Sequence, residues 1–206
     1  MLITSLDKYL TNKKGVIHVG GHDGEERDWY ISNGFEPVIW FEPNFELFDR
    51  LTKNIENYNM LAFNFGIHDT LKQAPLFISS NDGQSSSILE LGTHAKYYPD
   101  VKYTKSEIIE LKRLDTFFEE EKGFLNIKEF NFLNIDVQGV ELNVIKSLGQ
   151  LIKNIDYIYV EVNEEELYKG CSLLPDIDEY LSKYGFVRML TKMMKSHWGD
   201  AFYKRY

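Results

Sequence analysis

Acidic side chains follow three apolar segments of this chain, each at the point where a buried strand would end. Glu42 follows the apolar run 37–41, Asp136 closes the run 130–136, and Glu161 follows the run 155–160. A carboxylate in such a place can act as a general base, bind a cation or hold the hydroxyls of a ribose. Ligands of open α/β sheets bind at the carboxyl ends of the strands, so we expect Asp136 and Glu161 to point into one crevice. Each acid also has a plainer interpretation: Glu42 and Asp136 could cap the helices that follow them, and Glu161 could be a solvated carboxylate.

A glycine-rich segment precedes Glu42 by about 20 residues, the spacing of a nucleoside-binding pair. Gly20, Gly21, His22 and Gly24 follow the apolar run 15–19. Glycine allows the backbone to approach a ligand closely, and the N-terminus of a following helix favours negative charge. Taken alone, the segment could be an ordinary tight turn between a strand and a helix.

The elements that would position these residues alternate between strand and helix. Apolar runs predict strands at 15–19, 37–41, 60–64, 130–136 and 155–160, and helical periodicity predicts helices at 24–33, 45–55, 140–147 and 175–183. This alternation is typical of a parallel sheet with right-handed crossovers. In the helix 45–55, the spacing places Phe45, Phe48, Leu51, Thr52 and Ile55 on one face.

The remaining segments give weaker signals. They predict an amphipathic helix at 2–12, strands at 74–78 and 107–111, and two final strands at 186–190 and 201–206, joined by a loop that carries His197–Asp200. Residues 79–105 are expected to form a long loop over the sheet, and loops of that length are usually functional.

Composition narrows the class of protein. The chain has 206 residues, 43% of them hydrophobic, and a formal net charge of −9. This length and balance predict one domain over residues 1–206, and the negative charge argues against a nucleic-acid partner. Cys171 is the single cysteine, which excludes an intramolecular disulfide and fits a cytoplasmic location. No apolar run approaches the roughly 18 residues of a membrane span, and the N-terminus lacks a signal peptide.

Several motifs resemble those of the FkbM-type methyltransferases, which use S-adenosyl-L-methionine. The resemblance runs from about Gly15 to Tyr206 and rests on five segments, namely His18–His22, Glu42–Asn44, Ser85–Leu89, Leu114–Thr116 and Asp136–Glu141. His18 stands where the family usually has Asp, at a position that supports the loop under the methionine moiety. The ending Trp198–Ala201 is similar to a subgroup with His in the first motif and Gln in the last.

The resemblance implies a Rossmann-like, seven-stranded methyltransferase fold with an antiparallel C-terminal hairpin, and methyl transfer to a hydroxyl, most often of a sugar. We expect Asp136 and Glu161 to be catalytic. The cofactor would contact Gly20, Gly21, His22, Gly24, Glu42, Pro43, Asn44, Gly66, Ile67, Ser86, Asp136 and Val137. The small-molecule or glycan acceptor would contact His94, Tyr98, Tyr168, Trp198 and Asp200, residues expected in loops.

No metal site is expected, because no His pair or Cys cluster has metal-ligand spacing.

Two other functions remain open at this point. An NAD-dependent oxidoreductase would share the glycine turn and the acid, and Tyr98 and Lys102 have the spacing of a short-chain dehydrogenase pair. That chemistry requires both residues on one helix, whereas Pro99 lies between them. A non-catalytic binding module with the same fold is the other alternative, suggested by His18.

Overall fold

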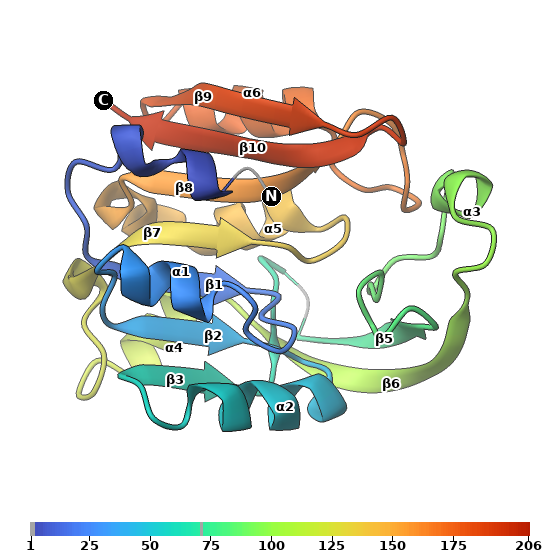
Figure 1. The fold of residues 1–206 in the computed structure, drawn as a ribbon, viewed down its shortest axis with the longest axis horizontal. Helices are drawn as coiled ribbons and strands as arrows, with labels where there is room; N and C mark the ends of the chain where they lie inside the picture. Colours follow the sequence, from blue (N-terminus) through green and yellow to red (C-terminus); the bar gives the residue numbers. More distant parts are fainter. Residues whose placement is uncertain (1–2, 71) are drawn as a thin grey trace.

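Buried apolar strands form the centre of the protein as a seven-stranded sheet (Figure 1). The computed structural model describes residues 3–70 and 72–206, and its main sheet has the order β3-β2-β1-β7-β8-β10-β9. The strands are β1 (Gly15–Val19), β2 (Val38–Phe41), β3 (Met60–Phe63), β7 (Phe130–Ile135), β8 (Tyr157–Asn163), β9 (Phe186–Met193) and β10 (Trp198–Arg205). All neighbours pair in parallel except β10, which is antiparallel to both β8 and β9. This arrangement confirms the expected fold with its C-terminal hairpin.

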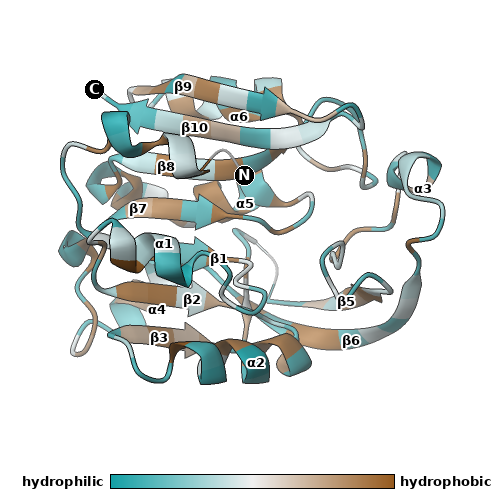
Figure 2. Ribbon diagram, viewed as in Figure 1, coloured by the Kyte–Doolittle hydropathy of each residue, from teal (hydrophilic) through white to brown (hydrophobic). Residues whose placement is uncertain are grey.

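Helices cover both faces of this sheet. On one face lie α1 (Arg27–Ser32) and α2 (Phe45–Ile55), and on the other lie α4 (Leu114–Glu120), α5 (Glu141–Ser147) and α6 (Leu174–Ser182). The strand residues alternate between the two cores: Val16 packs with Tyr30 of α1, while Ile17 packs in the core that holds α4, α5 and α6. Because both faces are covered, the central strands are mostly apolar, and Figure 2 shows brown along them, interrupted by a few teal polar positions, for example in β7.

A smaller sheet lies beyond the edge at which the parallel strands end (Figure 1). It has the order β4-β6-β5, formed by β4 (Gly66–Ile67), β5 (Gln73–Ser79) and β6 (Tyr103–Lys112). The segment between β5 and β6 carries the short helix α3 (His94–Tyr97). The expected loop 79–105 is therefore shorter than predicted, since it contains this helix and the start of β6.

The structure corrects three further sequence expectations. The predicted helix 2–12 is wrong: two 3-10 turns, η1 (Ile3–Ser5) and η2 (Asp7–Tyr9), replace it, and Leu2 lies outside the described residues. The helix α4 was not predicted, and two further short turns, η3 (Ile127–Glu129) and η4 (Gly149–Asn154), flank β7 and α5. Trp198 and Asp200 lie in β10 and His94 begins α3, so these three acceptor candidates do not lie in loops as expected.

The exposed face of α2 also differs from the prediction. Asn44 caps this helix by accepting hydrogen bonds from the backbone N–H groups of Glu46 and Leu47. The helix then buries Leu47, Leu51 and Ile55, whereas Phe45 is 66% exposed. Packing against the glycine turn and Trp40 selects this face. Within residues 3–70 and 72–206, no helix combines the length and apolar character needed to cross a membrane.

Candidate active site

A row of acidic residues lies at the carboxyl edge of the main sheet, and the register of the strands explains it. Trp40, His18, Asn134 and Tyr159 are ladder neighbours across β2, β1, β7 and β8. Side chains two residues apart share one face of a strand, so the next row along the same face is Glu42, Gly20, Asp136 and Glu161. Asp200 of β10 continues this row because it pairs with Glu161. The sheet thus brings the three predicted acids together at the point where its strand order reverses.

A cavity of about 550 Å³ opens above this row. Of the predicted site residues, those that line it are Gly20, Gly21, His22, Glu42, Pro43, Gly66, Ile67, Ser86, His94, Tyr98, Asp136, Val137, Glu161, Tyr168, Trp198 and Asp200. Gly24 and Asn44 do not line it. Gly24 packs on Leu51 behind the turn, and Asn44 caps α2, so a contact of either with a ligand stays a prediction.

Gly20 permits the closest backbone approach in the site. Its φ is +85°, and a Cβ atom at this position would lie 1.7 Å from the carbonyl oxygen of Asp136. The Gly20 amide donates to the carbonyl of Phe41 at 2.9 Å, and the Asp136 amide donates to the carbonyl of Val19 at 2.9 Å. The turn therefore lies directly between the ends of β2 and β7, and only glycine fits there.

Glu42 is held by backbone amides at the end of β2. Its Oε2 accepts from the amide of His22 at 2.9 Å, and its Oε1 accepts from the amide of Asn44 at 2.8 Å. Burial raises the pKa of Glu42 to about 7, while the two amides act in the opposite direction. Each carboxylate oxygen retains a second lone pair, so Glu42 can still accept a hydrogen bond from a ligand in the cavity.

Gln138 joins the two predicted catalytic carboxylates and was not singled out from the sequence. Its Nε2 donates to Asp136 Oδ1 at 2.6 Å and to Glu161 Oε1 at 3.0 Å. Its Oε1 accepts from the Tyr168 hydroxyl at 2.5 Å. Gln138 has a φ of +59°, which aims its side chain back over the strand ends. The resulting network fixes Asp136, Glu161 and Tyr168 relative to one another.

Both carboxyl groups of this pair have raised pKa values. The accessible surface of Asp136 lies within the cavity, where the surrounding protein limits hydration and raises its pKa to about 6; Asp200 adds to this rise. Burial raises the pKa of Glu161 well above its usual value, and the charge of Asp136 raises it further. Since Glu161 holds its proton to higher pH, Asp136 is the member of the pair that ionises first.

A third buried acid lies behind the pair. Glu141, in the first turn of α5, is fully buried, and its Oε1 accepts from the amide of Gly139 at 2.7 Å. Its Oε2 has no hydrogen-bond partner among the described residues. Burial raises the pKa of Glu141 to about 7.

The wall of the cavity opposite the glycine turn is aromatic. His94 and Tyr168 have ring centroids 5.5 Å apart, and the Nε2 of His94 lies 3.2 Å from the Ser85 hydroxyl. Trp198 of β10 donates through Nε1 to the Tyr98 hydroxyl at 2.8 Å. These contacts join the segment between β5 and β6 to the C-terminal hairpin, and all of these aromatic residues line the cavity. Tyr98 and Lys102 do not share a helix, because α3 ends at Tyr97.

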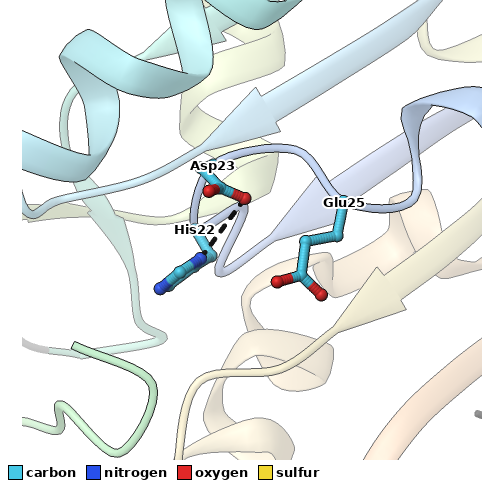
Figure 3. A group of neighbouring side chains, drawn as sticks. All are labelled: His22, Asp23 and Glu25. Carbon is cyan, nitrogen blue, oxygen red and sulfur yellow. Dashed lines mark ion pairs between the residues drawn. The ribbon is translucent and has the colours of Figure 1, made fainter. Parts of the chain in front are cut away.

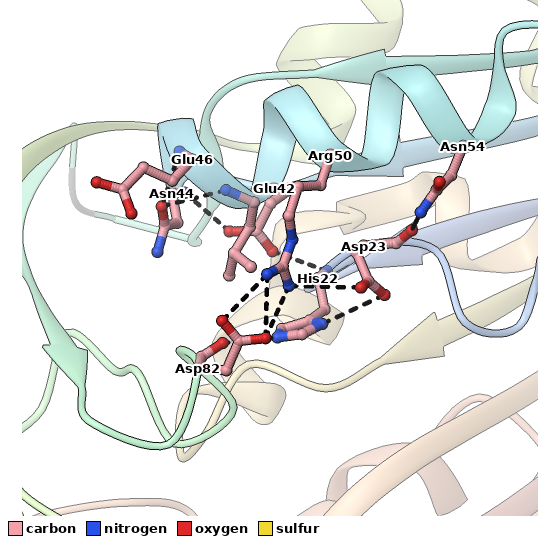
Figure 4. A network of polar contacts seen from close by, with 9 residues as sticks. His22, Asp23, Glu42, Asn44, Glu46, Arg50, Asn54 and Asp82 are labelled. Carbon is pink, nitrogen blue, oxygen red and sulfur yellow. Dashed lines mark hydrogen bonds and ion pairs between the residues drawn. The ribbon is translucent and has the colours of Figure 1, made fainter.

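A polar network fastens the loop after β5 to α2 and the glycine turn (Figure 4). Arg50 of α2 donates to both carboxylate oxygens of Asp82 at 3.0 Å and to Asp23 at 3.4 Å. The Nε2 of His22 lies 2.9 Å from the carbonyl oxygen of Asp82. Because Gly83, Ser85 and Ser86 of this loop line the cavity, the network holds one of its walls in place.

The turn also carries a group of ligand-type atoms, from His22, Asp23 and Glu25, within 4.8 Å of one another (Figure 3). His22 already contacts Asp82, and Asp23 pairs with Arg50. We therefore assign no ion to this group.

The sequence matches the family described as Methyltransferase FkbM domain over residues 18–188. The chain belongs to this family. It is 24% identical to the 2-O-methyltransferase NoeI of Sinorhizobium fredii (strain NBRC 101917 / NGR234) over 180 residues, which cover 84% of this chain and 72% of NoeI. Membership of the FkbM family makes the protein a methyltransferase and confirms S-adenosyl-L-methionine as the expected cofactor.

Solved structures support the fold. The chain superposes on Streptococcus pneumoniae Sp1610, in complex with S-adenosyl-L-methionine, with a TM-score of 0.55 and 10% identity, covering 98% of this chain and 71% of that one. For M. capricolum TrmK with S-adenosyl-homocysteine, the TM-score is 0.54 at 9% identity, covering 100% and 67%.

The chemistry of the cavity fits an S-adenosyl-L-methionine molecule, which carries a cationic sulfonium and a cationic ammonium. Acidic residues that line it are Glu25, Glu26, Glu42, Asp136, Glu161 and Asp200. Among the described residues that line it, Lys192 is the only Lys or Arg. Such a set favours a cationic ligand.

Proposed function

We propose that this FkbM-family protein transfers a methyl group to the hydroxyl of a sugar, in a glycan or a glycosylated metabolite. The observation that supports the proposal is the Asp136–Gln138–Glu161 network, in which two carboxyl groups share one amide inside a cavity that the glycine turn and aromatic residues also line. The likeness to a 2-O-methyltransferase supports oxygen as the accepting atom.

We assign the cofactor to the half of the cavity above β1 and β2. Glu42 is the residue placed to accept hydrogen bonds from the ribose hydroxyls, as an acid at the end of this strand does in nucleotide-binding sheets. Gly66 and Ile67, at the side of the cavity nearest β3, would border the adenine. Gly20 and Gly21 allow the methionine moiety to pass close to the backbone.

When bound, the cofactor supplies a methyl group already activated by the sulfonium, so the protein has to align the acceptor and remove its proton. Asp136 is the base in this proposal. Its pKa of about 6 leaves it ionised at neutral pH, yet far closer to the working pH than an ordinary Asp. Burial and the charge of Asp136 raise the pKa of Glu161, and in its protonated form it can donate a hydrogen bond to a second oxygen of the acceptor. Gln138 holds the two carboxyl groups in position.

The aromatic wall suits a sugar ring. Tyr98, Tyr168 and Trp198 each combine an apolar ring face with a polar tip, and their polar tips already have partners within the protein. Tyr98 and Trp198 are half-buried and line the cavity, so their rings can stack on the C–H face of a sugar. Tyr168 and His94 are buried against each other behind them, and Asp200 offers a carboxylate to the acceptor.

The test compares methyl transfer by the wild-type protein with Asp136→Ala and Glu161→Ala, over a panel of free, nucleotide-linked and polymer-bound sugars. Loss of a general base lowers turnover by about 100- to 10,000-fold. Asp28→Ala is the matched control, because this carboxylate is exposed on α1 and, among the residues that the structure describes, forms an ion pair with Arg27 alone. Thermal melting verifies that each variant folds. Wild-type rates in both Asp136→Ala and Glu161→Ala would refute the assignment of the base, and cofactor binding without transfer to any sugar would favour a non-catalytic module.

A further inference from the structure

None of the roles proposed so far uses the carboxylate of Glu26. It immediately precedes α1, lines the cavity, and has a side chain only 19% exposed. Burial raises its pKa to about 7, and the charges of Asp136 and Glu25 raise it further. Within the described residues, no Lys or Arg lies within 4.0 Å of it; the one basic side chain at that distance is His18.

His18 does not supply a positive charge. Burial lowers its pKa to about 3, so the ring is neutral at physiological pH. The ring stacks on Trp40 with centroids 4.4 Å apart, and its Nδ1 lies 3.0 Å from the Tyr30 hydroxyl. The same hydroxyl accepts from Asn134 Nδ2 at 2.6 Å. The ring is therefore held in place beneath the cavity, and Glu26 is left facing the cavity without a cationic partner.

We propose that Glu26 binds the ammonium group of the methionine moiety of the cofactor. A mostly buried carboxylate needs a cation or hydrogen-bond donors to remain ionised, and a cationic ligand in the cavity would supply that cation. Glu42 follows β2, Gly20 follows the neighbouring strand β1, and Glu26 precedes α1 with its carboxylate 4.0 Å from the His18 ring of β1.

Glu26 lies next to His18, a residue of the first motif. His18 is neutral, and the carboxylate of Glu26 lies 4.0 Å from its ring. Glu26 thereby acts on the charged end of the cofactor and not on its nucleoside. The inference rests on the cofactor alone, and it stands whether or not the acceptor is a sugar.

Calorimetry with two ligands separates this role from a general effect on the cavity. S-adenosylhomocysteine carries the amino-acid portion, whereas 5′-methylthioadenosine has the same nucleoside and sulfur without it. At pH 8, Glu26→Gln should weaken binding of S-adenosylhomocysteine by about 10- to 100-fold, the loss expected for a hydrogen bond between charged groups. Binding of 5′-methylthioadenosine should stay within about twofold of the wild type.

Two further variants complete the test. Asp28→Asn makes the same charge change on an exposed residue of α1 that does not line the cavity, and it should leave both ligands within about threefold of wild type. Glu26→Asp keeps the charge on a shorter side chain and should retain more affinity for S-adenosylhomocysteine than Glu26→Gln. Equal weakening of both ligands by Glu26→Gln, or no weakening of S-adenosylhomocysteine, would overturn the proposal. A wild-type protein that binds 5′-methylthioadenosine and S-adenosylhomocysteine equally well would also overturn it, without touching the proposed acceptor.

Discussion

Replacement of Gly20 by alanine tests the contact on which the site is built. The new Cβ atom would lie 1.7 Å from the carbonyl oxygen of Asp136, and both atoms belong to backbone segments held by hydrogen bonds to neighbouring strands. Neither can move without separating the glycine turn from the end of β7. The positive φ adds a cost of roughly 1–2 kcal/mol for any residue with a Cβ atom.

Alanine at Gly34 measures the conformational cost of a positive φ without the steric clash that it causes at Gly20. Gly34 has a φ of +74°, close to the +85° of Gly20, but a Cβ atom there would meet nothing within 4 Å. Gly34→Ala should therefore lose only the conformational part, about 1–2 kcal/mol, or roughly 2–8 °C in melting temperature. Gly20→Ala carries an added collision of about 1–3 kcal/mol or more, so it should lose at least about twice as much.

Chemical denaturation and calorimetric titration with S-adenosylhomocysteine measure both effects. Gly20→Ala should also abolish binding, because the displaced turn carries the amide that holds Glu42, whereas Gly34→Ala should bind like the wild type. Equal destabilisation by the two substitutions, or normal binding by Gly20→Ala, would refute the close approach of the turn to Asp136.

Three further predictions follow from the polar contacts. Gln138→Ala removes a hydrogen bond that lowers the pKa of Asp136, so the acidic limb of the kcat/KM profile should move up by about one to two pH units; an unchanged limb would contradict the role of Gln138. Glu141→Gln should raise the stability of the ligand-free protein by about 1–3 kcal/mol at pH 8 and by much less near pH 5, as measured by urea denaturation. The difference between the two pH values arises because the pKa of Glu141 is raised to about 7. The stability that its protonated form provides is lost as the pH rises through this value, so glutamine stabilises the protein mainly at the higher pH. Arg50→Ala should weaken binding of S-adenosylhomocysteine by about two- to fivefold, less at high salt, whereas Lys53→Ala, whose partner Asp49 lies on α2 itself, should have no effect.

The sequence was informative where local signals and burial agree. Four of the five parallel strands are short apolar runs buried on both faces, and in three of them an acid follows the apolar run, so the sequence predicts Glu42, Asp136 and Glu161 at one edge of the sheet. The range of α2 was also correct, because Asn44 provides a clear helix start.

Features that depend on tertiary contacts were missed. Phe45 fits the helical period but lies on the solvent side, since the packing of Leu47 and Leu51 decides the face. Glu26 was interpreted as part of the first turn of a helix, where acids are common, although α1 begins only at Arg27. Gln138 offers no sequence signal of its own, because its bridging role depends on the separation between two strands and on its positive φ.

The most direct test of the proposed function is the fate of a labelled methyl group. The protein would be incubated with S-adenosyl-L-methionine carrying a ¹³C methyl and with the same sugar panel, and the product would be analysed by mass spectrometry and NMR. We predict a labelled methyl group on a sugar oxygen with the wild-type protein and none with Asp136→Asn. Label on a nitrogen or carbon atom, or equal transfer by Asp136→Asn, would contradict the proposal.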